Sequence, residues 1–179
     1  QNEELQSGKG ERYWLAASPL QLLLVRLSIF TGIYWLLSMY YFGFAFTFYG
    51  IPHVADFAEL NLLILPFLLS AGFLGVFLGL ILPRRELATL LILLSSMPLI
   101  FASGFVWPTS AVPESLLWLV SAIPVVPAMN GFLRLNQMGA DFLDIFIYWK
   151  QLWYCTFTYG LLSYVVLFYK RRRSRMASE

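Results

Sequence analysis

The stretch "GFVWPTSAVP", residues 104–113, interrupts an apolar run and thereby decides how often the chain crosses a membrane. It ends one uncharged apolar segment and precedes a shorter one that contains Pro124 and Pro127. Proline supplies no backbone N–H, and it disfavours helical geometry in the residue before it. Tryptophan is enriched at the level of the lipid headgroups. Trp107 and Pro108 therefore predict that a transmembrane helix ends here.

The composition of the chain is that of a membrane protein. Of its 179 residues, 59% are hydrophobic and 12% are charged, whereas a typical soluble domain has about 25% charged residues. A soluble fold of this size has too little interior to bury so much apolar surface. The aromatic content of 18% agrees with this class, because tryptophan and tyrosine collect at both membrane interfaces.

Four segments are free of charge and long enough to cross the hydrocarbon, which takes about 20 apolar residues of helix. They are residues 27–49, 60–82, 87–107 and 151–169. The apolar part of 115–133 is shorter and broken by proline, which is more typical of a re-entrant or interfacial segment. We therefore predict an all-α membrane protein with about four transmembrane helices. The external loop, 108–150, should contain short helices that pack on the bundle or line a cavity.

The positions of the basic residues support four crossings and set the orientation. With four crossings, every Lys and Arg except Arg134 and Lys150 lies on one side of the membrane. Basic residues concentrate on the cytoplasmic side. A connecting segment, 1–26, and a basic tail, 170–179, are therefore both predicted to be cytoplasmic, before and after a transmembrane domain, 27–169. Five crossings would remove this asymmetry.

The predicted spans hold no Asp, Glu, Lys, Arg or His. Such residues in a membrane usually form ion paths or proton relays, so a proton-coupled transporter, a pump core and an intramembrane hydrolase are disfavoured. The only histidine, His53, lies in a short loop, and the only cysteine, Cys155, is expected to be a small buried apolar residue. No catalytic residue, metal site or cofactor is therefore predicted.

The sequence "SGKG", residues 7–10, does not form a phosphate-binding loop. That motif is G-x-x-x-x-G-K-[ST], in which backbone amides hold phosphates and a hydroxyl group holds magnesium. Here Glu3 takes the place of the first glycine, and Gly10 takes the place of the hydroxyl residue. The chain is not expected to bind ATP by itself.

The segment before the first span is expected to form an amphipathic helix on the cytoplasmic face. Glu11 and Arg12 would face water, while Trp14 and its apolar neighbours face the membrane. Ser18 and Pro19 are typical of an N-cap and a first helical position. Such a helix is placed to transmit movement from a soluble partner, although a plain membrane anchor fits the same residues. The polar opening of the chain is no signal peptide, and we expect the chain to be a region of a longer protein.

Ala71, Gly75 and Gly79 recur every four residues in the second predicted span. Small residues at this spacing let helix backbones approach closely. The stripe predicts either packing within the chain or an interface with a second subunit, and the residues alone leave both open.

The order of these parts resembles the second half of a type-2 ATP-binding-cassette (ABC) transporter permease, the membrane subunit of bacterial exporters. Three stretches carry the resemblance: "LAASPLQLLLVRL" (15–27), "PRRELATLLILLSSMPLIFASGFVWPTSAVPESL" (83–116) and "PAMNGFLRLNQMGA" (127–140). The first is similar to the family's cytoplasmic connecting segment, and the second to its basic turn, following span and external proline. The third is similar to the loop motif before the last span and is the most specific.

This resemblance implies a transport role in a bacterial cytoplasmic membrane, without nucleic acid. Two permease subunits, identical or different, would pair, and separate ABC ATPase subunits would dock on the cytoplasmic side and drive the cargo outward. The implied ATPase-coupling residues are Glu11, Arg12, Trp14, Ser18 and Pro19. The implied external loop motif comprises Trp107, Pro108, Pro113, Arg134, Asn136, Gln137 and Gly139. The nature of the cargo stays open.

Two other functions fit parts of the sequence. A scaffold or assembly protein with four spans and no transport of its own would also have spans without charge. A membrane enzyme acting on lipids would need catalytic groups from the external loop, such as Asp141, Asp144 or Arg134. Those side chains are more simply interpreted as interface charges, and for Arg134 a headgroup contact and a salt bridge that orders the loop both fit.

Overall fold

The computed structural model of the chain describes residues 19–51, 54–82, 85–104, 106, 113 and 120–176. Regular structure in these residues is helical throughout, as the sequence predicts. The elements are α3 (Pro19–Ser38), the π-helical segment η1 (Met39–Ala45), α4 (Phe46–Phe48), α5 (Phe57–Ile81), α6 (Arg85–Ala102), α8 (Val125–Gln137) and α9 (Phe142–Met176).

Three helical segments are long and apolar enough to span a membrane: Leu23–Phe48, Phe57–Ile81 and Phe142–Lys170. The first of them joins α3, η1 and α4 without a break. The third predicted span, 87–107, falls on α6, a shorter apolar helix of 18 residues that ends at Ala102 rather than at Trp107. At 1.5 Å per residue it is about 27 Å long, slightly less than the roughly 30 Å thickness of the hydrocarbon.

The helix bounds differ from the charge-free segments at several ends. Pro19 is the first residue that the structure describes, so the helix start that Ser18-Pro19 predicts stays a prediction. Helix α9 begins at Phe142, whereas the uncharged run begins at Gln151, and its first turns carry Asp144 and Lys150. These polar residues lie at the end of a long helix, where charged side chains reach the membrane surface.

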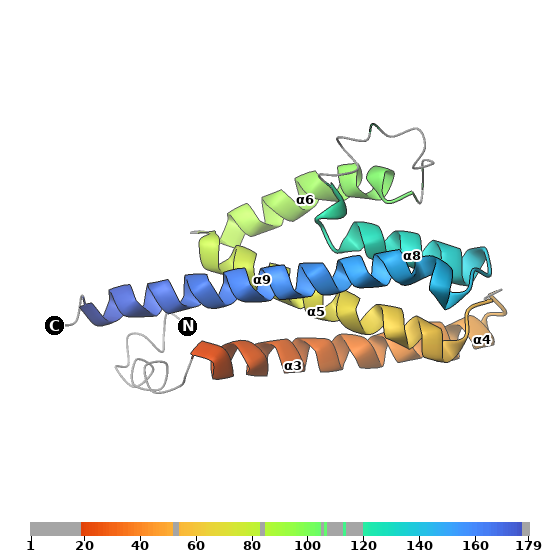
Figure 1. Ribbon diagram of the computed structural model, residues 1–179, viewed down its shortest axis with the longest axis horizontal. Coiled ribbons are helices and arrows are strands. Elements are labelled where there is room, and N and C mark those ends of the chain that lie inside the picture. The colour runs from red at the N-terminus through yellow and green to blue at the C-terminus, as the bar shows by residue number, and fades with distance from the viewer. Residues whose placement is uncertain are drawn as a thin grey trace.

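Helices α3, α5 and α9 lie side by side, and α8 lies along the first part of α9 (Figure 1). Helices α5 and α9 run in the same direction, because their contacts advance together along both sequences. The end of α4, the start of α5, the end of α8 and the start of α9 meet at one end of the bundle (Figure 1). We call this the α4–α5 end.

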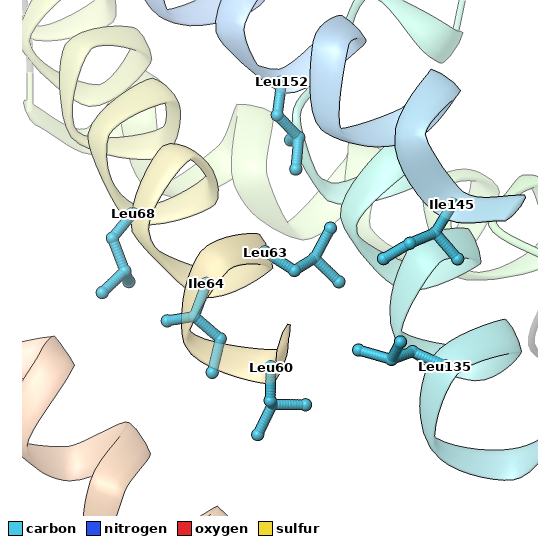
Figure 2. Close-up of a cluster of buried hydrophobic side chains, with 7 residues drawn as sticks. All are labelled: Leu60, Leu63, Ile64, Leu68, Leu135, Ile145 and Leu152. Carbon is cyan, nitrogen blue, oxygen red and sulfur yellow. The ribbon is translucent and has the colours of Figure 1, made fainter. Parts of the chain in front are cut away.

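The buried core joins α5, α8 and α9. Figure 2 shows its seven apolar side chains, which are Leu60, Leu63, Ile64, Leu68, Leu135, Ile145 and Leu152. Leu135, Ile145 and Leu152 are each at most 1% exposed. Helix α8 approaches closely at Gly131, where an added Cβ would lie 3.0 Å from Cδ1 of Leu63. The expectation that the loop's short helix packs on the bundle is thus confirmed for α8.

Side chains at every seventh position of α9 donate hydrogen bonds to backbone carbonyls of α5. Trp149 Nε1 donates to Leu62 O (3.1 Å), Thr156 Oγ1 to Pro66 O (3.2 Å), Ser163 Oγ to Phe73 O (3.1 Å) and Lys170 Nζ to Leu80 O. A seven-residue step returns to nearly the same face of a helix. We call these four side chains the donor row of α9.

One member of the donor row replaces a bond that α5 itself cannot make. In a regular helix the Leu62 carbonyl would accept from the N–H of residue 66, but Pro66 lacks that group. Trp149 Nε1 supplies a donor to this carbonyl from the neighbouring helix. A proline inside a transmembrane helix is tolerated when neighbouring groups satisfy the backbone in this way.

Replacing Trp149 tests this arrangement. Trp149→Phe should lower the free energy of unfolding by about 1 kcal/mol, because Leu62 O then has no donor in lipid. In a Pro66→Ala background, residue 66 supplies its own N–H to the Leu62 carbonyl. There, Trp149→Phe should lower the free energy of unfolding by less than half as much. Both values follow from unfolding the purified protein in mixed micelles with increasing SDS.

Trp153→Phe is the matched control. The Nε1 atom of Trp153 is buried and has no hydrogen-bond partner among the described residues. Removing it should therefore leave the free energy of unfolding unchanged or raise it slightly. Equal losses for the two tryptophans would show that ring packing rather than the Leu62 bond is responsible.

Candidate functional site: a membrane groove beside α9

A groove with a volume of about 720 Å³ lies between α9 and the segment that leads into α8. Most of its wall is one face of α9, with side chains three and four residues apart, as expected for a helix face. The lining side chains that carry polar atoms include Lys150, Gln151, Tyr154, Thr158 and Tyr159. The opposite wall is the turn at Ser121 and Ala122. The groove therefore runs alongside a transmembrane helix.

The chain bends at residues 122–124, between the helical residues 120–121 and the start of α8, although this segment lies against the spanning part of α9. Its bend coincides with Pro124, which is fully buried, as is Pro127. Helix α9 satisfies the carbonyls of this bend: Gln151 Nε2 donates to Ser121 O (3.2 Å), and both Tyr159 OH (2.8 Å) and Cys155 Sγ (3.5 Å) donate to Ala122 O. Irregular backbone at membrane depth requires partners of this kind. This part of the loop is therefore fixed to α9.

The chemistry of the groove is that of a binding surface. Its lining is mainly apolar, with hydroxyl groups of Tyr154 and Thr158 and the ammonium of Lys150 along it. The Lys150 Nζ atom lies 5.0 Å from the centre of the Phe146 ring, within the range of a cation–π contact. No group of three or more His, Cys, Asp or Glu side chains that could hold a metal occurs in the part of the chain that the structure describes.

The four described residues at the end of the external loop motif lie in the last turn of α8 and just beyond it. Arg134 places its guanidinium 5.4 Å from the centre of the Tyr148 ring on α9, so it joins α8 to α9 by a cation–π contact. Gly139 ends the helix with φ +62°, the left-handed geometry that favours glycine at this position. Asn136 is 3% exposed, whereas Gln137 is exposed.

The remaining predicted residues lie mostly outside the described parts of the chain. Trp107 and Pro108 do so, and Pro113 is described only as exposed. Of the implied coupling residues, Glu11, Arg12, Trp14 and Ser18 lie outside, and Pro19 is the first residue described in α3.

The small-residue stripe of α5 lines a groove beside α3, and the two helices touch at only one point of it. Gly72, next to Ala71, packs on α3: an added Cβ would lie 2.6 Å from Cδ1 of Leu27 and 3.2 Å from Phe30. An added Cβ at Gly75 or Gly79 would meet nothing within 4 Å. The close approach within the chain is therefore at Gly72, and an interface with a second subunit at Gly75 and Gly79 stays a prediction.

The sequence interpretation missed the polar side chains of α9 that hold the fold together. Gln151, Thr156, Tyr159 and Ser163 all bond to backbone carbonyls of other segments. Their signal was available, because polar residues in an otherwise apolar span usually face protein. The seven-residue step from Trp149 to Thr156 and Ser163 would have identified the donor row.

Removing one hydroxyl group should loosen the bend. Tyr159→Phe deletes the stronger of the two donors to Ala122 O and leaves only the weak Cys155 thiol, at a cost of about 1 kcal/mol. Hydrogen exchange at the Ile123 and Val126 amides should therefore become roughly fivefold faster. Tyr154→Phe is the control, since this tyrosine lines the same groove and is 72% exposed. Hydrogen exchange measured by mass spectrometry should become faster in Tyr159→Phe only. Equal exchange rates in the two variants would contradict the role of Tyr159 in holding the bend.

Gly72 and Gly75 of α5 should respond differently to replacement by leucine. Gly72→Leu forces α3 away from α5 and should destabilise the protein by about 1–3 kcal/mol. Gly75→Leu has open space within the chain and should change stability by less than about 0.5 kcal/mol. Unfolding in SDS gives both values, and chemical cross-linking of the membranes reports whether Gly75→Leu separates two subunits. A large loss of stability for Gly75→Leu would mean that this face packs within the subunit.

Comparison with known proteins agrees with the architecture. The family model described as "ABC-2 family transporter protein" matches residues 1–165. No curated protein and no solved structure matches the chain. The match extends from the segment before α3 through α8 and into the apolar part of α9. The chain therefore belongs to the ABC-2 family of transporter proteins and is a membrane permease of an ABC transporter.

Proposed function

We propose that this chain is the membrane part of an exporter permease that pairs with a second permease subunit and is driven by separate ATPase subunits. The observation that carries the proposal is the family match over residues 1–165, which includes the segment before α3. The "SGKG" sequence lacks the pattern of a phosphate-binding loop, which supports a separate chain as the source of ATP hydrolysis.

The proposed coupling element leads directly into a long helix. Helical structure continues from Pro19 through η1 to Phe48, a length of about 45 Å at 1.5 Å per residue. A push on the segment before Pro19 would thus act on one end of a continuous helical rod. Contact between α3 and α5 at Gly72 offers a path for that movement into the bundle.

The orientation in the proposal is that of a bacterial cytoplasmic membrane protein with both ends of this chain in the cytoplasm. The distribution of Lys and Arg supports it. The α4–α5 end then faces outward, and the groove beside α9 is open to the membrane on the path of an outward-moving cargo. A scaffold without transport is the competing function, and it requires neither an ATPase partner nor movement of α3.

The first experiment identifies what the protein binds. The full-length natural protein, gently extracted from its own membrane, should co-purify in fixed stoichiometry with a subunit that contains a complete G-x-x-x-x-G-K-[ST] loop. Trp14→Ala together with Pro19→Ala should reduce the recovered ATPase by about tenfold, the effect of losing roughly 1.4 kcal/mol of binding. Quantitative mass spectrometry of the purified complex gives both results.

Tyr49→Phe, at the opposite end of the same helical rod, is the control and should retain the ATPase. If an intact complex contains no nucleotide-binding subunit, the scaffold function replaces the proposed one. If the ATPase is present but remains bound in the double variant, the coupling residues are misassigned while the transporter function stands.

A further inference from the structure

A second, more polar cavity, of about 340 Å³, lies at the α4–α5 end of the bundle. Three parts of the chain that are distant in sequence line it: η1 and α4 with Phe42 and Phe46, the start of α5 with Asp56 and Phe57, and the last turn of α8 with Asn136. The ends of these elements converge there in Figure 1. The cavity is separate from the groove beside α9.

Asn136 brings an unsatisfied donor to this cavity. Its side chain is 3% exposed, and its Nδ2 atom has no hydrogen-bond partner among the described residues. The main-chain carbonyl of Asn136, in contrast, has a partner: it accepts a hydrogen bond from the Val54 N–H at 3.3 Å. Leaving a buried amide donor unpaired is costly, so a ligand with an acceptor oxygen would be stabilised here.

Asp56 brings a negative charge to the rim of the same cavity. It occupies the N-cap position of α5 with extended geometry (ψ 140°), yet its carboxylate makes no capping bond to the first turn. A capping aspartate normally accepts such a bond. The carboxylate is exposed, and the rings of Phe42, Phe46 and Phe57 line the cavity beside it. A carboxylate near aromatic rings favours a cation.

The cavity lies at the depth of the lipid headgroups. One candidate span ends at Phe48 and the next begins at Phe57, and the cavity is built from residues on both sides of this connection. Because spans of 26 and 25 residues are longer than the roughly 30 Å thickness of the hydrocarbon, their ends reach the polar part of the bilayer. Phe48 and Tyr49, next to the cavity in sequence, are 70% and 73% exposed, as interfacial aromatic residues are.

We propose that this cavity binds the ethanolamine headgroup of a phospholipid. The ammonium group pairs with Asp56 beside the phenylalanine rings, and the buried Asn136 amide turns its Nδ2 toward a phosphate oxygen, which accepts the hydrogen bond. The inference depends on this end of the chain being at a membrane surface and does not depend on an ATPase partner or on the direction of transport.

Lipid retention tests the proposal. The full-length protein is reconstituted into nanodiscs with equal amounts of phosphatidylethanolamine and phosphatidylglycerol, extracted, and analysed by native mass spectrometry. Phosphatidylethanolamine should be enriched about tenfold among the retained lipids, and Asp56→Asn should abolish the enrichment. Asp141→Asn, which removes an exposed carboxylate outside the cavity, should keep it. No enrichment in the unaltered protein, or equal losses in both variants, overturns the proposal.

Asn136→Leu separates ligand binding from folding. Leucine matches the shape of asparagine, so the unfolding midpoint in pure phosphatidylglycerol should stay the same or rise, while the lipid preference is lost. Gln137→Leu, at the exposed neighbouring position, should keep the preference. A lipid preference that survives Asn136→Leu overturns the role of the amide.

A soluble ligand is distinguished from a lipid in detergent. Phosphatidylethanolamine added to the delipidated protein should raise the unfolding midpoint more than soluble phosphoethanolamine at equal concentration. If both raise it equally, the occupant is a solute, and the lipid assignment is overturned.

Discussion

The structure depends on the absence of water in the hydrocarbon, which obliges the protein to satisfy its own backbone. Helix α5 contains Pro66 and so leaves the Leu62 carbonyl without its helical donor, and Trp149 of α9 fills that place. Thr156 and Ser163 continue the same row of contacts along α5. Each such bond contributes on the order of 0.6 kcal/mol in a membrane. Their larger effect is on register, because a shift of one residue would rotate the whole row away from α5.

The same constraint explains the position of the loop. The bend at 122–124 would be unstable in lipid, yet α9 accommodates it with donors from Gln151, Cys155 and Tyr159. Helix α9 therefore binds α5 on one side and the bend on the other. The described end of the loop, the groove and the core at Leu135 and Ile145 are held in one unit with α9. Displacement of α9 in a transport cycle would carry the groove wall with it.

Hydropathy predicted the class of fold and most of the helices, because it reports how many segments are apolar and how long they are. Trp107 and Pro108 predicted the end of the third span five residues too late, because α6 already ends at Ala102. The prolines at 124 and 127 predicted a broken segment that packs on the bundle, and its described part does so. These features depend on neighbouring residues only, so the sequence around each one is sufficient to predict it.

What hydropathy did not predict is which face of each helix meets which neighbour. Trp149 and Pro66 are far apart in sequence, and neither one alone indicates that they act together. The stripe of Ala71, Gly75 and Gly79 has the spacing of a packing face, but α3 approaches at Gly72. The role of Asn136 was likewise hidden, since burial of its amide depends on α8 packing against the start of α5.

The contacts of α3 are unevenly distributed along its length, and this bears on how movement would pass through it. Near its start it is in close contact with α5 at Gly72 through Leu27 and Phe30, and further on Trp35 Nε1 donates to Asn61 Oδ1 at 3.1 Å. Beyond Ser38 the helix widens into η1, where the Phe46 N–H reaches back to Tyr41 O. A π-helical segment has a looser backbone than an α-helix and often occurs at functional sites. Force applied at Pro19 would therefore reach α5 before it reaches η1, and η1 is the segment of this rod best able to change shape around a headgroup in the adjoining cavity.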